Sequence, residues 1–185
     1  MLKPTYPITT DRLILRPFTP DDLDALHAYH RLPEVARHLY WEPHDLQATR
    51  DHLDKKIQRV SLEKEGDSIA AAVTLRESGE LIGESALLWT SEQHRGGEIG
   101  YIFNPAHHGH GYATEATREM LRLGFDGLGL HRIVGRLDGR NTASANVLQR
   151  LGMRREAHLR QNELVKGEWT DEVIYAMLAD EWTRP

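Results

Sequence analysis

The sequence predicts a mixed α/β (α+β) fold with a central, mostly antiparallel sheet of about seven strands and helices on both faces. Residues 68–103 alternate apolar and polar side chains between glycine-containing turns, which predicts an antiparallel meander of three strands. Strand-like and helix-like segments then alternate, and residues 98–137 have the pattern of strand, helix and strand. Such a unit gives one parallel pair with a right-handed crossover. A length of 185 residues suits a single domain over residues 1–185.

The N-terminal third carries one strand and two helices. Apolar and polar alternation predicts a strand over residues 10–18. Thr19 and Pro20 favour the start of a helix that must end before Pro33. A second helix is expected to begin near Asp45. Its apolar face is expected to carry Leu46, Leu53, Ile57 and Val60.

Beyond residue 68, the spacing of apolar residues predicts the remaining strands and helices. The predicted strands cover residues 68–76, 80–89, 98–103, 132–137, 153–164 and 172–178. The predicted helices between them cover residues 112–125 and 143–151.

Composition excludes several classes of protein and site. With 23 basic and 28 acidic residues the net charge is −5, which disfavours a nonspecific nucleic-acid binder. The absence of cysteine removes disulfides, thiolate zinc sites and cysteine nucleophiles. The apolar runs are too short to span a membrane, and residues 1–7 lack the apolar stretch of a secretory signal. We therefore expect a cytoplasmic protein without nucleic-acid or membrane partners, as a monomer or homodimer.

Gly109 and Gly111 lie in a short loop between a predicted strand and a predicted helix. Glycines allow close approach of a ligand to the backbone, and the free amides of the first helical turn suit a phosphate. The alternative is a glycine-rich connection without a ligand. No GxxxxGK[ST] phosphate loop is present, and Thr114 stands where the Rossmann fingerprint requires glycine or alanine.

The segment 108–113, HGHGYA, resembles the acetyl-CoA pyrophosphate loop of the GNAT acetyltransferase superfamily, whose pattern is Gln/Arg-x-x-Gly-x-Gly/Ala. His108 replaces the usual Gln or Arg. The preceding residues 98–103, EIGYIF, are similar to a strand of the RimJ/RimL branch that pairs with the pantetheine arm. The resemblance implies a GNAT-type sheet and acetyl-CoA as the acetyl-donor cosubstrate. The residues that it places at the cofactor are Tyr101, Ile102, Phe103, His108, Gly109, His110, Gly111, Tyr112 and Ala113.

A second resemblance lies at residues 141–153, where the family has Asn-x-x-Ser followed by Gly-Phe; Met153 takes the place of Phe. It implies that Asn141 binds the cofactor arm and that Ser144 lies near the thioester sulfur. The alternative is that both are ordinary polar residues at a helix start. Residues 11–22 and 166–178 are also typical of RimJ/RimL-like chains, so the resemblance spans nearly the whole sequence.

Acetyl transfer to an amine needs a deprotonated amine, a stabilised oxyanion and a proton for the leaving thiolate. Without cysteine, direct attack by a bound amine in a ternary complex is the simpler route. Many GNAT enzymes carry a proton-donating tyrosine seven residues after the motif asparagine, and here Leu148 stands there. Ser144 is the candidate donor instead, and Glu84 and Glu98 are candidate bases. The alternative for each carboxylate is a solvated strand residue.

We therefore predict an N-acetyltransferase that moves the acetyl group of acetyl-CoA to the primary amine of a protein N-terminus or a small molecule. A non-catalytic acyl-CoA-binding or sensing module remains an alternative, because the tyrosine is missing. A nucleotide-binding domain unrelated to CoA requires both motif matches to be accidental.

Two further groups of residues invite a functional interpretation. His107, His108 and His110 lie within four loop residues, where chelation would be strained, so we predict no metal site. Trp41 and Trp169 are predicted to line the acceptor pocket, with ordinary packing as the alternative.

Overall fold

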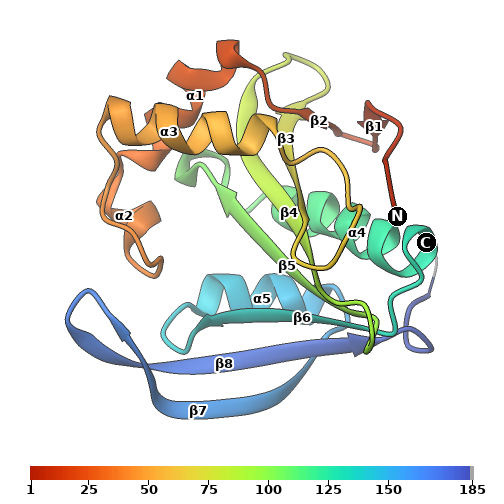
Figure 1. Ribbon diagram of the computed structural model, residues 1–185. Helices are drawn as coiled ribbons and strands as arrows, with labels where there is room; N and C mark the ends of the chain where they lie inside the picture. Colours follow the sequence, from red (N-terminus) through yellow and green to blue (C-terminus); the bar gives the residue numbers. More distant parts are fainter. Residues whose placement is uncertain (184–185) are drawn as a thin grey trace.

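The computed structural model describes residues 1–183 and contains an eight-stranded sheet in the order β1-β2-β3-β4-β5-β6-β8-β7 (Figure 1). All neighbouring strands are antiparallel except β5 and β6, as predicted. The sheet has one strand more than expected, since Ile8–Thr9 pairs with β2 along its edge. The strands are β1 Ile8–Thr9, β2 Leu13–Pro17, β3 Ser68–Leu75, β4 Leu81–Ser91, β5 Gly96–Phe103, β6 Arg132–Asp138, β7 Arg154–Val165 and β8 Glu168–Leu178.

Five α-helices accompany the sheet in the described part of the chain. They are α1 Leu23–His30, α2 Pro33–Ala36, α3 Leu46–Ile57, α4 Tyr112–Arg122 and α5 Thr142–Arg150. The short helix α2 was not predicted, because four residues carry no helical period. Within residues 1–183, none of the helices has the length and apolar character needed to cross a bilayer.

Apolar side chains fill both faces of the sheet, which confirms the predicted layers. Along β3, Ile69, Ala71 and Val73 join the cluster that holds Ala116 and Met120 of α4. The alternate residues of β3, Ala70 and Ala72, join the cluster formed with α1 and α3. The side-chain period of two thus sends successive residues of one strand into two different cores.

Three predicted boundaries differ from the structure for packing reasons. The strand predicted over residues 10–18 corresponds to β2, which begins at Leu13. The preceding residues form a turn in which the amide of Thr10 donates to the carbonyl of Leu13. Helix α3 starts after Asp45 as predicted, but Leu46 is 45% exposed and Val60 lies beyond the helix end. The predicted helix 112–125 changes to a π-helical turn after Arg122. At this turn the backbone of Gly124 packs so closely on β6 that a Cβ added to it would lie 2.5 Å from the side chain of Ile133.

The parallel pairing of β5 and β6 is short. Gly96–Glu98 of β5 pairs with Arg132–Val134 of β6, and no pairing continues from there to the ends of the two strands. Figure 1 shows β5 and β6 diverging beyond this point. The sheet is therefore split between β5 and β6, and residues 99–103 of β5 have no strand partner on the β6 side.

Candidate functional site

Two adjoining cavities lie at the split in the sheet. The large cavity has a volume of about 680 Å³ and is enclosed by α2, the end of β5, the start of α4 and the start of α5. The small cavity, of about 270 Å³, lies between β5 and β6. The walls of both cavities share His38, Leu39, Tyr101, Ile102, Asn141 and Ser144.

The first turn of α4 forms one wall of the large cavity. Gly109 and Gly111 both have φ of +82°, a backbone conformation that side-chain-bearing residues rarely adopt. No side chain caps the first turn of α4, so its amides are left for solvent or a ligand. The helix dipole adds positive potential at the same place. This arrangement suits an anion such as a phosphate or pyrophosphate.

Arg12 anchors this loop from the other end of the chain. Its guanidinium donates to the carbonyl of His110 at 2.9 Å and to the carboxylate of Glu115 at 2.7 Å. It also lies over the ring of Tyr112, at 4.8 Å from the centroid. Thr10 donates to Glu115 at 2.6 Å, and these bonds hold the pKa of Glu115 below its usual value despite partial burial. The start of β2 therefore fixes the loop before α4, which sequence reasoning did not foresee.

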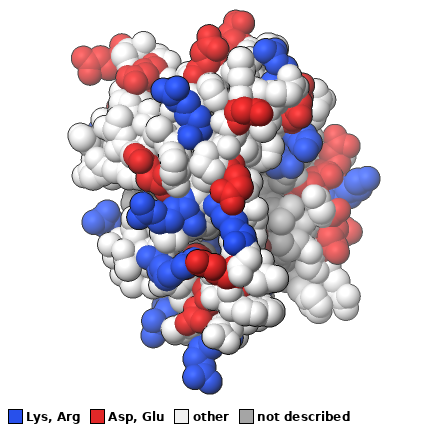
Figure 2. Space-filling model, turned by 90° about the vertical axis from the view of Figure 1, so that its left-hand side faces the viewer, with Lys and Arg blue, Asp and Glu red and all other residues white. Residues whose placement is uncertain are grey.

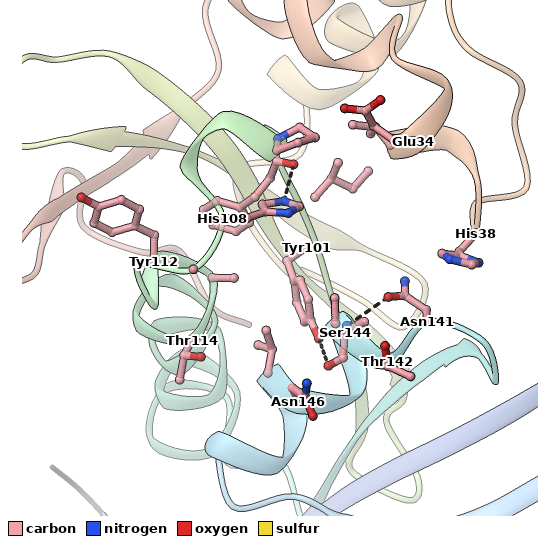
Figure 3. Close-up of a pocket in the computed structure, with 18 of the residues that line it drawn as sticks. Glu34, His38, Tyr101, His108, Tyr112, Thr114, Asn141, Thr142, Ser144 and Asn146 are labelled. Atoms are coloured by element: carbon pink, nitrogen blue, oxygen red, sulfur yellow. Dashed lines mark hydrogen bonds between the residues drawn. The ribbon is translucent and has the colours of Figure 1, made fainter.

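Tyr101 and Ser144 form a hydrogen-bonded pair that lines both cavities. The hydroxyl of Tyr101 lies 2.8 Å from Oγ of Ser144 and 2.9 Å from its carbonyl oxygen, and Figure 3 shows the two side chains pointing toward one another. Burial raises the pKa of Tyr101 to about 12, so its hydroxyl stays protonated at neutral pH. Asn141 caps α5 by accepting from the amide of Ser144 at 3.0 Å, which fixes the position of that serine.

Leu148 takes no part in this polar group. It is 1% exposed and packs against Gly135 of β6, where an added Cβ would meet it at 2.8 Å.

The two candidate carboxylates occupy different environments. Glu84 is 6% exposed and lines the small cavity; its Oε1 accepts from Lys56 at 2.9 Å, while Oε2 has no hydrogen-bond partner. Glu98 lines neither cavity, because it lies where β5 is still paired with β6. Burial raises the pKa of Glu98, against the opposing effect of Arg136 at 3.5 Å.

Most residues predicted to contact a cofactor lie in the wall of the large cavity. These are Tyr101, Ile102, Phe103, His108, Gly109, Gly111, Tyr112, Ala113, Asn141 and Ser144. His108 also bonds the carbonyl of Phe103 at 3.1 Å, which leaves one of its ring nitrogens free. His110 does not line the cavity; it is exposed and stacks on Tyr112 at 5.5 Å between ring centroids.

The two tryptophans predicted for the acceptor pocket line neither cavity. Trp169 is 62% exposed on β8, beside Leu164. Trp41 packs on the ring of His44, with 4.1 Å between centroids, in a cluster that also holds His30 and His52.

Several charged residues complete the walls, although no motif in the sequence marks them. Arg37, Arg140 and Arg150 line the large cavity, and Figure 2 shows Lys and Arg side chains gathered across the middle of the left-hand face of Figure 1. The small cavity is lined by the cations Lys56, Arg59 and Arg136 and by the carboxylates Glu84 and Asp138.

Comparison with known proteins gives consistent matches. A family model described as an acetyltransferase (GNAT) domain matches residues 12–154. The uncharacterized N-acetyltransferase YnaD of Bacillus subtilis is 33% identical over 175 residues, covering 95% of this chain and 98% of that protein. The crystal structure of a GNAT-family acetyltransferase from Bacillus anthracis has a TM-score of 0.85 at 30% identity, covering 94% of this chain and 99% of the other.

A more distant match shows the fold alone. The spermidine N-acetyltransferase of Vibrio cholerae, solved in complex with CoA and spermine, has a TM-score of 0.76 at 22% identity. The match covers 93% of this chain and 98% of that one.

The anchoring by Arg12 generates a first prediction. In the variant Arg12→Ala the loop before α4 loses its bonds to Arg12, and its amides should exchange with deuterium up to about fivefold faster, as suits an exposed ion pair. Hydrogen-exchange mass spectrometry of peptides covering residues 106–113 measures this. The control Asp11→Ala alters an exposed neighbour and should leave the exchange unchanged. Equal protection in both variants would contradict the anchoring role.

Proposed function

This chain belongs to the GNAT acetyltransferase family, and we propose that it transfers the acetyl group of acetyl-CoA to a primary amine in a ternary complex. The observation that carries the proposal is the split between β5 and β6. It joins a large cavity that ends at the first turn of α4 to a small cavity that holds a buried carboxylate. In this proposal residues 1–185 act as one acetyltransferase domain.

The large cavity is proposed to hold acetyl-CoA. Its volume lies within the range of about 300–1,000 Å³ that is usual for small-molecule sites. The pyrophosphate would accept from the uncapped amides at the start of α4, in a cavity whose wall also carries Arg140 and Arg150. The pantetheine amides would bond the backbone of residues 101–103, which lacks a strand partner on that side. The CoA bound in the Vibrio protein of the same fold supports this choice of donor.

The small cavity is proposed to hold the acceptor, with Glu84 as the group that binds and deprotonates its amine, directly or through a water molecule. Lys56 occupies one carboxylate oxygen, and the other has no protein partner. The amine nitrogen attacks the thioester carbonyl, the C–N bond forms as the C–S bond breaks, and the amine proton passes to Glu84. Since the chain has no cysteine, this direct route needs no covalent enzyme intermediate.

Ser144, bonded to Tyr101, is proposed to supply the proton for the leaving thiolate. A free serine hydroxyl is a poor acid, but the protonated Tyr101 hydroxyl at 2.8 Å can replace the proton that Ser144 gives up. Both side chains line the two cavities at once, so they stand where donor and acceptor would meet.

The charges of the small cavity narrow the class of acceptor. Three cations and two carboxylates line it, and both carboxylates already pair with cations, Glu84 with Lys56 and Asp138 with Arg140. Arg136 is also paired, with Glu98 and Glu172. Among the described residues of the lining, Oε2 of Glu84 is therefore the one carboxylate oxygen left for a first ammonium group, and a polyamine finds no unpaired carboxylate for a second. We therefore propose an amine with a single charge, either the N-terminus of a protein, as the RimJ/RimL-like motifs imply, or a small monoamine.

One observation favours a second candidate function, a non-catalytic acyl-CoA-binding module. Leu148 is buried in apolar surroundings at the position where many relatives carry the proton-donating tyrosine. Such a module would bind acetyl-CoA as tightly as an enzyme and show no turnover with any amine.

Thermal unfolding with acetyl-CoA, CoA and ATP, followed by thiol release with a panel of monoamines, polyamines and N-terminal peptides, tests both candidates. Ligand at about 100-fold over its dissociation constant adds about 2.7 kcal/mol, and each kcal/mol raises Tm by about 2–4 °C at this size. We expect a rise of about 5–10 °C with both CoA species and none with ATP. No rise with CoA would overturn the proposal, and a rise without turnover on any amine would favour the binding module.

The variant Glu84→Gln tests the proposed base. It keeps an oxygen for Lys56 and removes the proton acceptor, so kcat should fall by about 100-fold while KM for acetyl-CoA stays unchanged. Steady-state thiol release measures both constants. The control Glu77→Gln, in the exposed turn between β3 and β4, should keep full activity. Wild-type kcat in Glu84→Gln would assign the base elsewhere.

The variants Tyr101→Phe and Ser144→Ala test the proton donor. Each should lower kcat, Ser144→Ala by about 100-fold and Tyr101→Phe by less, with little change in acetyl-CoA binding. Because burial raises the pKa of Tyr101 to about 12, its ionisation should not reduce the wild-type rate up to about pH 10. The matched control Tyr6→Phe removes another buried hydroxyl, which has no hydrogen-bond partner among the described residues and lines neither of the two cavities. If Tyr101→Phe and Tyr6→Phe behave alike, the pair plays no part in proton transfer.

A further inference from the structure

Three histidines from separate segments converge next to Trp41, and none of them lines either cavity. His30 ends α1, His44 lies in the connection before α3, and His52 lies on α3. One ring nitrogen of each can be chosen so that all three lie within 4.8 Å of one another. These residues are called the histidine triad below. The backbone holds the convergence in place, because the amide of His44 donates to the carbonyl of His30 at 3.0 Å.

Three buried ring nitrogens of the histidine triad have no hydrogen-bond partner among the described residues, although buried polar atoms normally have one. His30 has no exposed surface, and neither of its ring nitrogens has a hydrogen-bond partner within residues 1–183. Nδ1 of His44 is also buried and unpartnered. Nearly all buried polar groups in folded proteins have partners, so each exception needs an explanation such as an ion or a water molecule. Two unpartnered rings turned toward a third point to one shared ligand.

The chemistry of the rings favours a metal ion over an anion or an organic cation. Neutral imidazoles are common metal ligands, and one ring nitrogen of each of the three lies within 4.8 Å of the others. Lys56 already donates to Glu84 at 2.9 Å, which offsets its repulsion of a second positive charge. Imidazole ligands suit zinc, copper, nickel and iron rather than magnesium or calcium.

We propose that His30, His44 and His52 bind one divalent transition-metal ion, for which zinc is the typical occupant of a three-imidazole site. At Zn–N bonds of 2.0–2.1 Å, tetrahedral ligand atoms are separated by about 3.3 Å, so the side chains must draw together by up to about 1.5 Å. His44 on its loop and the partly exposed His52 have the freedom to do so. A water molecule would take the fourth position.

Glu84 lies where a carboxylate would orient the ring of a metal-bound His30. Nε2 of His30 lies 3.9 Å from Oε1 of Glu84, just beyond hydrogen-bond range. A histidine that binds a metal through one nitrogen usually donates the other N–H to a carboxylate or carbonyl, which fixes the ring. Binding through Nδ1 would leave Nε2–H directed at Glu84. The metal site would then stabilise the packing of α1 and α3 beside the small cavity, whether or not the chain transfers acetyl groups.

The loop histidines that the sequence singles out already have partners. His107 bonds Glu80 at 3.0 Å, His108 bonds the carbonyl of Phe103, and His110 stacks on Tyr112. They provide a matched control, since they lie closer in sequence than the histidine triad but are not among the groups of the described residues whose ligand atoms converge.

The test is a metal titration of the full chain, expressed without a histidine tag and stripped with EDTA. Co²⁺ reports its coordination through visible absorption, and Zn²⁺ binding is measured by competition with a chromogenic chelator. Because Trp41 lies on His44, bound Co²⁺ should also quench tryptophan fluorescence, and Trp41→Phe should abolish that quenching while leaving Zn²⁺ affinity similar. We expect one ion per chain at micromolar or lower metal concentration, with a four- or five-coordinate Co²⁺ spectrum.

Variants assign the binding to the histidine triad. His52→Ala, on the partly exposed face of α3, should weaken Zn²⁺ binding by at least about 100-fold and keep the metal-free Tm and circular dichroism. His44→Ala should do the same, so the assignment does not depend on the buried His30. The double variant His107→Ala/His110→Ala should bind as wild type does. Absence of stoichiometric binding, or binding that survives His52→Ala and disappears in the double variant, would overturn the proposal.

Discussion

The limited pairing between β5 and β6 is the constraint on which the site depends. Three residues of each strand form the parallel ladder, and then the strands separate. Backbone groups left unpaired inside a protein are costly unless something bonds them, so the exposed edge of residues 99–103 is suited to an extended ligand with amides of its own. Because β5 leads directly into the glycine loop and α4, the free strand edge and the uncapped helix start are consecutive in the chain. One interruption of the sheet therefore creates the two cavities and places the anion site at the end of one of them.

Features governed by neighbouring residues could be predicted from the sequence. The alternation in residues 68–103 predicts the meander of β3, β4 and β5, and the helix starts predicted near Asp45 and at residue 143 lie within one residue of those of α3 and α5. Positive φ at Gly109 and Gly111 is what a glycine pair before a helix indicates. Predictions became wrong where packing from a distant segment decides. Leu46 matches the helical period and lies on the same side of α3 as Leu53, yet it is the first residue of the helix and stays 45% exposed.

The site itself depends on contacts that no local pattern contains. Arg12 and Glu115 are 103 residues apart in sequence, and Tyr101 and Ser144 are 43 apart. Glu84 and Glu98 could not be ranked from the sequence, since both lie on predicted strands with the same period. In the register of β4 and β5, Glu84 faces Ile102 while Glu98 faces Leu88, which puts both carboxylates on one side of the sheet. The two carboxylates differ in their position relative to the end of the β5–β6 ladder. Glu84 lines the small cavity that opens beyond this end, while Glu98 lies on the part of β5 that is still paired with β6.

Glu84 connects the proposed acceptor site with the histidine triad, and its surroundings determine how it can act. A buried carboxylate is destabilising unless cations and hydrogen bonds compensate it, and here Lys56 compensates one oxygen while the other has no partner. An ion bound by the triad would add positive charge on the side of Oε1, where His30 already lies 3.9 Å away. That charge would repel the ammonium group of an acceptor that approaches the same carboxylate. With the ion bound, Glu84 would therefore hold a charged acceptor less firmly. If both proposals hold, metal occupancy and acceptor binding are linked through this one side chain.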